Sequence, residues 1–229
     1  YKATLVGGET FADLTAGFGV DCSFLARNFK CADYVERQEV LCDLARNNFS
    51  VLGLNHIRVH QADGIDYLQQ MDKVDCLFLD PARRDGNGGK TVAISDCEPD
   101  VCRLEPLLVE KGDVVMVKLS PMLDMASALN DLKHVRQVHV VAVNNECKEL
   151  IILLKKPNEA ENCVDNEKTI VCEQVVNNSA SQHFSYTLSE EKNAVCAIAD
   201  KVGAYLYEPG AALLKAGPYK LLSARYGVG

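Results

Sequence analysis

Apolar residues follow two spacings along residues 1–156. Short apolar runs of strand length occur at 10–14, 32–36, 57–63, 74–80 and 113–120. Between them, apolar residues recur at helical spacing at 20–29, 40–49, 65–71 and 99–109. Apolar strands that alternate with segments of this kind are typical of βαβ units, so the pattern predicts a mostly parallel sheet.

The alternation ends in two strand patterns that follow each other closely. Residues 135–144 and 148–156 both have the spacing of strands, and only about three residues separate them. So short a connection leaves no room for a helical crossover, and the two strands are therefore predicted to be antiparallel. A parallel sheet that closes with an antiparallel pair differs from an ordinary dinucleotide-binding sheet.

The composition changes after Pro157. Residues 158–168 are polar and indicate a linker. Strand patterns follow at 169–176 and 183–189, then a helix near 190–200 and a second helical stretch after residue 210. We therefore predict two domains, 1–156 and 157–229, of which the second is a small α+β domain that is incomplete in this sequence.

Bulk composition narrows the class of protein. The 229 residues are 48% hydrophobic with a mean hydropathy of −0.06. No apolar run is long enough to span a membrane and no cationic leader is present, so we expect a cytoplasmic protein without a membrane partner. The first residue is Tyr1 rather than Met, and we expect the chain to be part of a longer protein.

The ten cysteines do not have the pattern of a metal site or a disulfide framework. Cys22, Cys42, Cys76 and Cys172 lie in apolar periodic segments, and no pair has CxxC spacing. We interpret them as buried reduced thiols and predict no bound metal.

The charge is acidic throughout. The formal net charge is −8, and both predicted domains hold more Asp and Glu than Lys and Arg. This acidic charge argues against nonspecific electrostatic binding of duplex nucleic acid over a large surface. It does not exclude a local basic patch beside a site.

The segment "DLTAGFGVD" (13–21) joins the first strand to the first helix and has the features of a ligand-binding loop. Gly17 and Gly19 remove side chains where backbone would approach a ligand, and the helix start adds oriented N–H groups. Asp13 precedes the loop, Glu36 ends the second strand, and Asp63 follows the third. An acid in the place of Glu36 accepts hydrogen bonds from both hydroxyls of a ribose.

These acids favour S-adenosylmethionine over a nicotinamide dinucleotide. The third glycine of the nicotinamide fingerprint is replaced by Cys22. A pyrophosphate has no use for the carboxylate of Asp13, whereas the ammonium group of an amino-acid moiety does. The alternative is that the acids only cap strands and helices.

The stretch "LFLDPARRDGNGG" (77–89) ends the fourth strand pattern. Pro81 fixes its own φ and biases Asp80 toward an extended backbone, which would hold that carboxylate in one place. We predict a functional turn in which Asp80 faces the transferable group and Arg83 reaches the acceptor. In the alternative, Asp80 caps the glycine-rich tail and Arg83 pairs with Asp85 in solvent.

Further polar residues are expected on the same edge of the sheet. After the fifth parallel strand come Lys118, Ser120 and Asp124, which we predict to bind substrate together with Arg83 and Arg84. For Lys118, an ion pair with a motif carboxylate is an equal alternative.

Taken in order, "DLTAGFGVD", "VERQ", "ADG", "LDPARRD" and "VKLSPMLD" resemble the class I S-adenosylmethionine-dependent methyltransferases. The segment "YLYEPGAALLKAGPYKLL" (205–222) is similar to the C-terminal THUMP-like domain of a bacterial group within them. The resemblance implies an α/β, Rossmann-like sheet of seven strands with an antiparallel last strand, plus a small ferredoxin-like α+β domain. It also implies that the cofactor contacts Asp13, Thr15, Ala16, Gly17, Phe18, Gly19, Glu36, Arg37, Ala62, Asp63, Gly64 and Asp80.

Residues 80–83, which follow the fourth strand, differ from the motif of the family members that methylate exocyclic amines. Those carry an Asp or Asn, two prolines and an aromatic ring; this sequence keeps Asp80 and Pro81 but has Ala82 and Arg83. Carbon-5 methylation of pyrimidines would need a cysteine where Arg83 stands. We predict catalysis by Asp80, Pro81 and Arg83, S-adenosylmethionine as cofactor and an RNA base (tRNA or rRNA) as acceptor. A small-molecule or protein methyltransferase and a non-catalytic cofactor-binding module are the alternatives.

Overall fold

The computed structural model describes residues 1–83, 93–157, 167–176, 181–201 and 203–229. By their internal contacts the residues form two compact units, Tyr1–Val135 with Ile152–Pro157 and Arg136–Ile151 with Asn158–Gly229. These bounds differ from the predicted domains in two respects, because residues 136–151 group with the C-terminal part and Pro157 groups with the first unit.

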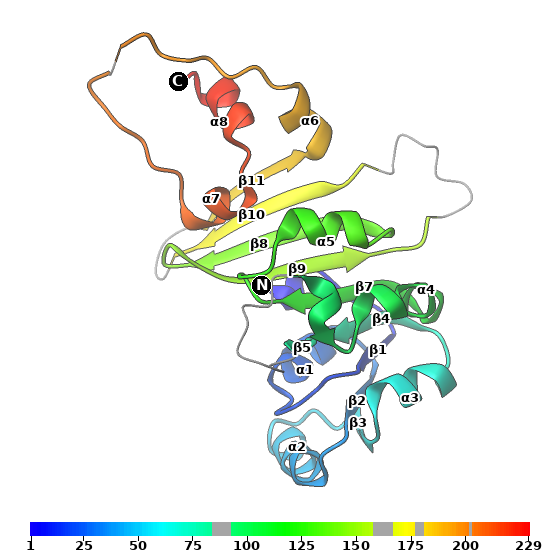
Figure 1. Cartoon of the computed structure of the whole chain (residues 1–229). Coiled ribbons are helices and arrows are strands. Elements are labelled where there is room, and N and C mark those ends of the chain that lie inside the picture. Colours follow the sequence, from blue (N-terminus) through cyan, green and yellow to red (C-terminus); the bar gives the residue numbers. More distant parts are fainter. Residues whose placement is uncertain (84–92, 158–166, 177–180, 202) are drawn as a thin grey trace. The chain divides into compact units, whose positions relative to one another are not determined.

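Parallel strands form the sheet of the first unit. They are β1 (Thr10–Asp13), β2 (Cys31–Glu36), β3 (Ile57–Gln61), β4 (Val74–Leu79) and β7 (Gly112–Leu119). Their order is β7-β4-β1-β2-β3, and each pairs in parallel with its neighbour (Figure 1). The carboxyl ends of these strands therefore meet at one edge, as the alternating pattern predicted.

Helices follow the strands of the first unit, near the predicted positions except for the last, at 125–131, which was not predicted. They are α1 (Val20–Leu25), α2 (Glu39–Val51), α3 (Gly64–Gln70), α4 (Val101–Lys111) and α5 (Met125–Asp131). Single turns of 3-10 helix span η1 (Lys2–Thr4), η2 (Ala26–Asn28) and η3 (Ile94–Asp96), and β5 (Ala82–Arg83) pairs antiparallel with β6 (Cys97–Glu98).

The apolar residues spaced along 20–29 are buried only in part. Val20 and Phe24 are 62% and 61% exposed, whereas Cys22 and Leu25 are buried. The cysteines at 22, 42, 76 and 172 are all buried and free, which confirms their interpretation as buried thiols.

The second unit contains two strand pairs and short helices. They are β8 (Val135–Val143), β9 (Glu146–Leu154), β10 (Thr169–Val175), β11 (Gln182–Thr187), α6 (Leu188–Asn193), α7 (Ala211–Ala216) and α8 (Tyr219–Tyr226). Val135 at the start of β8 and Ile152–Leu154 at the end of β9 belong to the first unit. Asn144 and Asn145, with φ of 49° and 63°, make the two-residue turn between β8 and β9. Such a turn joins antiparallel neighbours, as predicted for this pair.

The strand count is larger than the seven expected. The hydrogen-bonded order is β11-β10-β8-β9-β7-β4-β1-β2-β3, a nine-stranded sheet. The seven strands from β8 to β3 correspond to the expected sheet, in which β9 lies between β8 and β7 as the antiparallel strand. The added strands arise because β10 pairs in parallel with β8 from Thr169 to Val175, which satisfies the backbone groups of an edge that would otherwise be open.

No helix within the described residues is long and apolar enough to cross a membrane.

Candidate functional site

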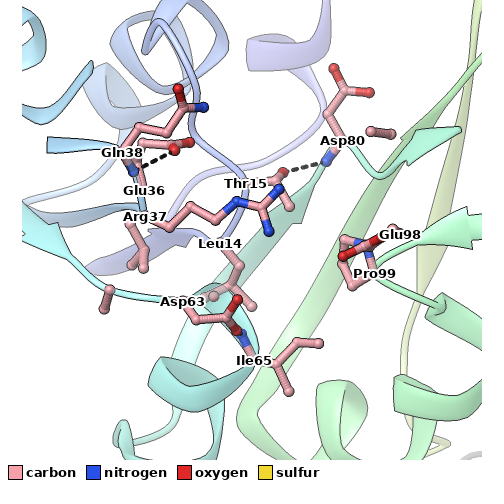
Figure 2. Close-up of a pocket in the computed structure, with 14 residues that line it drawn as sticks. Leu14, Thr15, Glu36, Arg37, Gln38, Asp63, Ile65, Asp80, Glu98 and Pro99 are labelled. Atoms are coloured by element: carbon pink, nitrogen blue, oxygen red, sulfur yellow. Dashed lines mark hydrogen bonds between the residues drawn. The ribbon is translucent and has the colours of Figure 1, made fainter. Parts of the chain in front are cut away.

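A pocket lies at the carboxyl ends of β1 to β4 (Figure 2). It is lined by Leu14, Thr15, Val35, Glu36, Arg37, Gln38, Ala62, Asp63, Gly64, Ile65, Asp80, Ala82, Glu98 and Pro99. The structure thus brings together seven of the residues predicted to contact a cofactor: Thr15, Glu36, Arg37, Ala62, Asp63, Gly64 and Asp80.

Acidic side chains dominate the polar lining. Glu36, Asp63, Asp80 and Glu98 contribute carboxylates, and Arg37 is the one basic residue among the lining residues. Figure 2 shows the Arg37 side chain extending into the pocket toward Thr15. Such a lining favours a ligand that carries positive charge.

Glu36 connects the second strand to the first loop. Its Oε2 atom accepts a hydrogen bond from the Gly17 N–H at 3.1 Å, and its Oε1 atom accepts one from the Gln38 N–H at 2.9 Å. A carboxylate has about four lone-pair sites, so both oxygens keep capacity for hydroxyl groups of a ligand. The Tyr34 hydroxyl donates to the Gly17 carbonyl and further fixes the loop.

The two loop glycines are required by the backbone itself. Gly17 and Gly19 have φ of +52° and +74°, and a Cβ on Gly19 would lie 2.9 Å from Cζ of Phe49. Between them Phe18 is 72% exposed. The predicted contacts Ala16, Gly17, Phe18 and Gly19 are not among the residues that line the pocket. Gly17 is thus required by its positive φ, and Gly19 both by its positive φ and by the close approach of Phe49.

Asp13 does not line the pocket either, although it was predicted to face an ammonium group. The side chain is buried, with 1% exposure, and its Oδ1 accepts a hydrogen bond from the Thr15 N–H at 3.1 Å. Burial raises the pKa of this carboxyl well above its usual range, the Thr15 bond opposes the shift, and the nearby carboxylate of Asp21 adds to it. The Asp13 side chain therefore points into the protein interior and not into the pocket.

Asp63 caps a helix, as the alternative interpretation of the acids expected, and it also lines the pocket. Its Oδ1 accepts hydrogen bonds from the N–H groups of Ile65 at 2.8 Å and Asp66 at 3.4 Å, so the residue is the N-cap of α3. The next residue, Gly64, lies against the loop backbone, because a Cβ there would be 2.1 Å from the Leu14 carbonyl oxygen. The cap and the close approach together fix the third strand end beside the first loop.

Asp80 is held at two points. Its backbone N–H donates to Oγ1 of Thr15 at 2.7 Å, as Figure 2 shows, and its Oδ2 forms an ion pair with Nζ of Lys118. The pair follows from the register, since Leu79 is the partner of Val117 across β4 and β7. For Lys118, the ion-pair alternative is therefore the one that the structure adopts.

Two predicted substrate residues have local roles instead. The Ser120 hydroxyl accepts from the Met122 N–H at 3.3 Å, and Asp124 caps α5 through bonds from Ala126 at 2.8 Å and Ser127 at 3.4 Å. Neither residue lines the pocket. A polar residue that precedes a helix more often satisfies the helix start than a ligand.

The remaining predicted catalytic residues are described in part. Pro81 is buried and does not line the pocket, whereas Ala82 does. The backbone of Arg83 pairs with Cys97 in the β5–β6 ladder. The Arg83 side chain and the whole of Arg84 lie outside the described residues.

Sequence reasoning missed one wall of the pocket, which Glu98 and Pro99 form. They lie there because β6 pairs with β5, which is formed by the last two residues of the segment Asp80–Arg83. Strands of two residues have no periodic signal, so only the X-Pro dipeptide marked this segment as a turn.

A family model of a ferredoxin-like domain matches residues 205–229. No curated protein matches the chain significantly. A crystal structure from Porphyromonas gingivalis W83, provisionally named a methyltransferase, is 32% identical with a TM-score of 0.85 and covers 98% of this chain. The chain spans about half, 55%, of that protein.

A second solved structure is more distant. TrmK from M. capricolum was crystallised with the cofactor product S-adenosylhomocysteine. It is 11% identical, with a TM-score of 0.51, and the match covers 72% of this chain and 70% of that protein. The chain therefore has the Rossmann-like fold of class I methyltransferases.

Proposed function

We propose that the protein is an S-adenosylmethionine-dependent methyltransferase. The observation that carries the proposal is the pocket in which the carboxylates of Glu36, Asp63 and Asp80 follow β2, β3 and β4 at one sheet edge. The fold shared with the two solved structures supports it, as does the S-adenosylhomocysteine bound to TrmK.

The lining residues fit the parts of this cofactor in order along the edge. Glu36 would accept the ribose hydroxyls, Ala62 and Asp63 would lie beside the adenine, and Asp80 would lie near the positive sulfonium. The sulfonium brings an activated methyl group, so the protein need only hold and align the acceptor.

We further propose an RNA base, in tRNA or rRNA, as the acceptor, and the cytoplasm as the place of action. The motif resemblance and a C-terminal end that we assign to a THUMP-like domain support this. The net charge of −8 does not, because an acidic protein gains little from phosphate contacts. That charge favours the second candidate, a methyltransferase for a small molecule or a protein.

Two titrations of the full-length protein test these proposals. Calorimetry should show binding of S-adenosylhomocysteine and none of NAD; absence of cofactor binding would reject the methyltransferase. Bulk tRNA and rRNA should bind at low salt, with an affinity that falls as salt rises. If no RNA binds even at low salt, the RNA acceptor is rejected while the methyltransferase proposal stands.

A further inference from the structure

We propose that Lys118 is a specificity-determining residue that reads the acceptor together with Asp80. The two side chains offer one hydrogen-bond acceptor and one donor side by side. They would recognise a ring edge on which an amine adjoins an accepting ring nitrogen, as on adenine, cytosine and guanine. The inference rests on the proposed methyl transfer and names the chemical class of its acceptor.

The position of Lys118 separates it from the cofactor pocket. Asp80 follows β4, the strands β1, β2 and β3 lie on one side of β4, and β7 lies on the other. Asp80 lines the pocket and Lys118 does not, although the register places them next to each other. Asp80 thus has the pocket on one side and the Lys118 ammonium group on the other.

Both groups keep capacity for a ligand. The Lys118 side chain is 26% exposed and that of Asp80 is 38% exposed. Among the described residues, the ion pair with Asp80 Oδ2 is the one contact of Lys118 Nζ, which leaves two of its three N–H donors available. The Asp80 carboxylate likewise keeps its Oδ1 lone pairs for an N–H of the acceptor.

The same two strands carry a second ion pair at their other ends. Lys73 precedes β4 and Asp113 lies at the start of β7, with Nζ and Oδ1 2.5 Å apart. Their side chains are 57% and 54% exposed, and neither residue lines the pocket that contains Asp80. This pair joins the strands in the same way and is therefore a matched control for a purely structural role.

The chemical step balances without any other reactant. The amine nitrogen forms a bond to the methyl carbon, the carbon–sulfur bond breaks, and its electron pair returns to sulfur, which becomes a neutral thioether. The amine proton passes to the Asp80 carboxylate and from there to water. Lys118 transfers no proton; it donates to the ring nitrogen beside the amine and so fixes the ring in register with the methyl group.

The test uses the full-length protein with methyl-labelled S-adenosylmethionine and total RNA from cells that lack the gene. Lys118→Met should lower kcat/KM for RNA by roughly 10- to 100-fold, the effect of losing a hydrogen bond from a charged group, with unchanged affinity for S-adenosylhomocysteine. Lys118→Gln, which keeps N–H donors without the charge, should retain part of the activity, and Lys73→Met should retain all of it. Digestion should place the label on the exocyclic amine of adenine, cytosine or guanine.

Each contrary outcome has a distinct meaning. If wild-type protein labels RNA and Lys118→Met labels it equally fast, the inference is wrong and the methyltransferase stands. Label on a ribose hydroxyl, a base carbon or a ring nitrogen also overturns the inference alone. If wild-type protein binds cofactor but labels no RNA, the nucleobase acceptor and this inference fail together; if it binds no cofactor, the proposed function itself fails.

Discussion

Replacing Glu36 with Ala should weaken the binding of S-adenosylhomocysteine without unfolding the protein. The carboxylate lines the pocket and accepts backbone N–H bonds from Gly17 at 3.1 Å and Gln38 at 2.9 Å. Loss of the hydrogen bonds to the ribose should cost about 2 kcal/mol, because bonds to a charged group exceed neutral ones. That free energy corresponds to a roughly 30-fold higher Kd at 25 °C.

The same substitution leaves two loop N–H groups without their partner. Because Gly17 and Gln38 lie near solvent, each lost bond should lower the free energy of unfolding by about 1 kcal/mol. Thermal or urea unfolding measures this second effect separately from binding. Glu36→Gln keeps one accepting oxygen and should fall between wild type and Glu36→Ala in both measurements.

Calorimetric titration with S-adenosylhomocysteine is the assay, and Glu39→Ala is the control. Glu39 lies in the first turn of α2, is exposed and makes no side-chain hydrogen bond among the described residues. A general electrostatic effect would weaken binding in both variants. Unchanged affinity in a folded Glu36→Ala protein would refute the assignment of Glu36 to the ribose.

Further substitutions have expected outcomes. Asp80→Asn should preserve affinity for S-adenosylhomocysteine and lower kcat by roughly 100-fold, since an amide keeps an accepting oxygen but takes up no proton; full activity would exclude a base at Asp80. Burial raises the pKa of Asp13, so the folded state keeps a proton that the unfolded chain loses above about pH 4, and stability falls as pH rises from there. Asp13→Asn should flatten that fall in urea unfolding; an unchanged slope would show that Asp13 is ionised. Gly64→Ala, with a Cβ 2.1 Å from a backbone oxygen, should cost about 3 kcal/mol of unfolding free energy, whereas Gly53→Ala, with open space at φ +70°, should cost about 1 kcal/mol.

Much of the fold was predictable because each buried strand is a short apolar run between helices. The runs that became β1, β2, β4 and β7 are almost wholly buried, so burial and periodicity agree there. The nine-strand sheet was not predictable in the same way. β10 joins β8 through backbone hydrogen bonds between residues about thirty apart, and such pairing leaves no mark in local spacing.

The residues of the candidate site likewise include some that the sequence could predict and some that it could not. Glu36, Asp63 and Asp80 could be placed together because the carboxyl ends of parallel strands meet at one edge. Asp13 follows the same rule in sequence but is buried, since an acid at a strand end can point to either side of the loop that follows. Glu98 reaches the pocket through a two-residue strand pair, which is too short for any periodic signal.

Methyl transfer itself tests the central claim most directly. Full-length wild-type protein is incubated with methyl-labelled S-adenosylmethionine and total RNA from cells that lack the gene, and label in purified RNA is measured against time. The account predicts incorporation that rises with protein concentration and is abolished by excess S-adenosylhomocysteine. No incorporation into RNA, by protein that binds S-adenosylhomocysteine, would contradict the RNA methyltransferase that we propose.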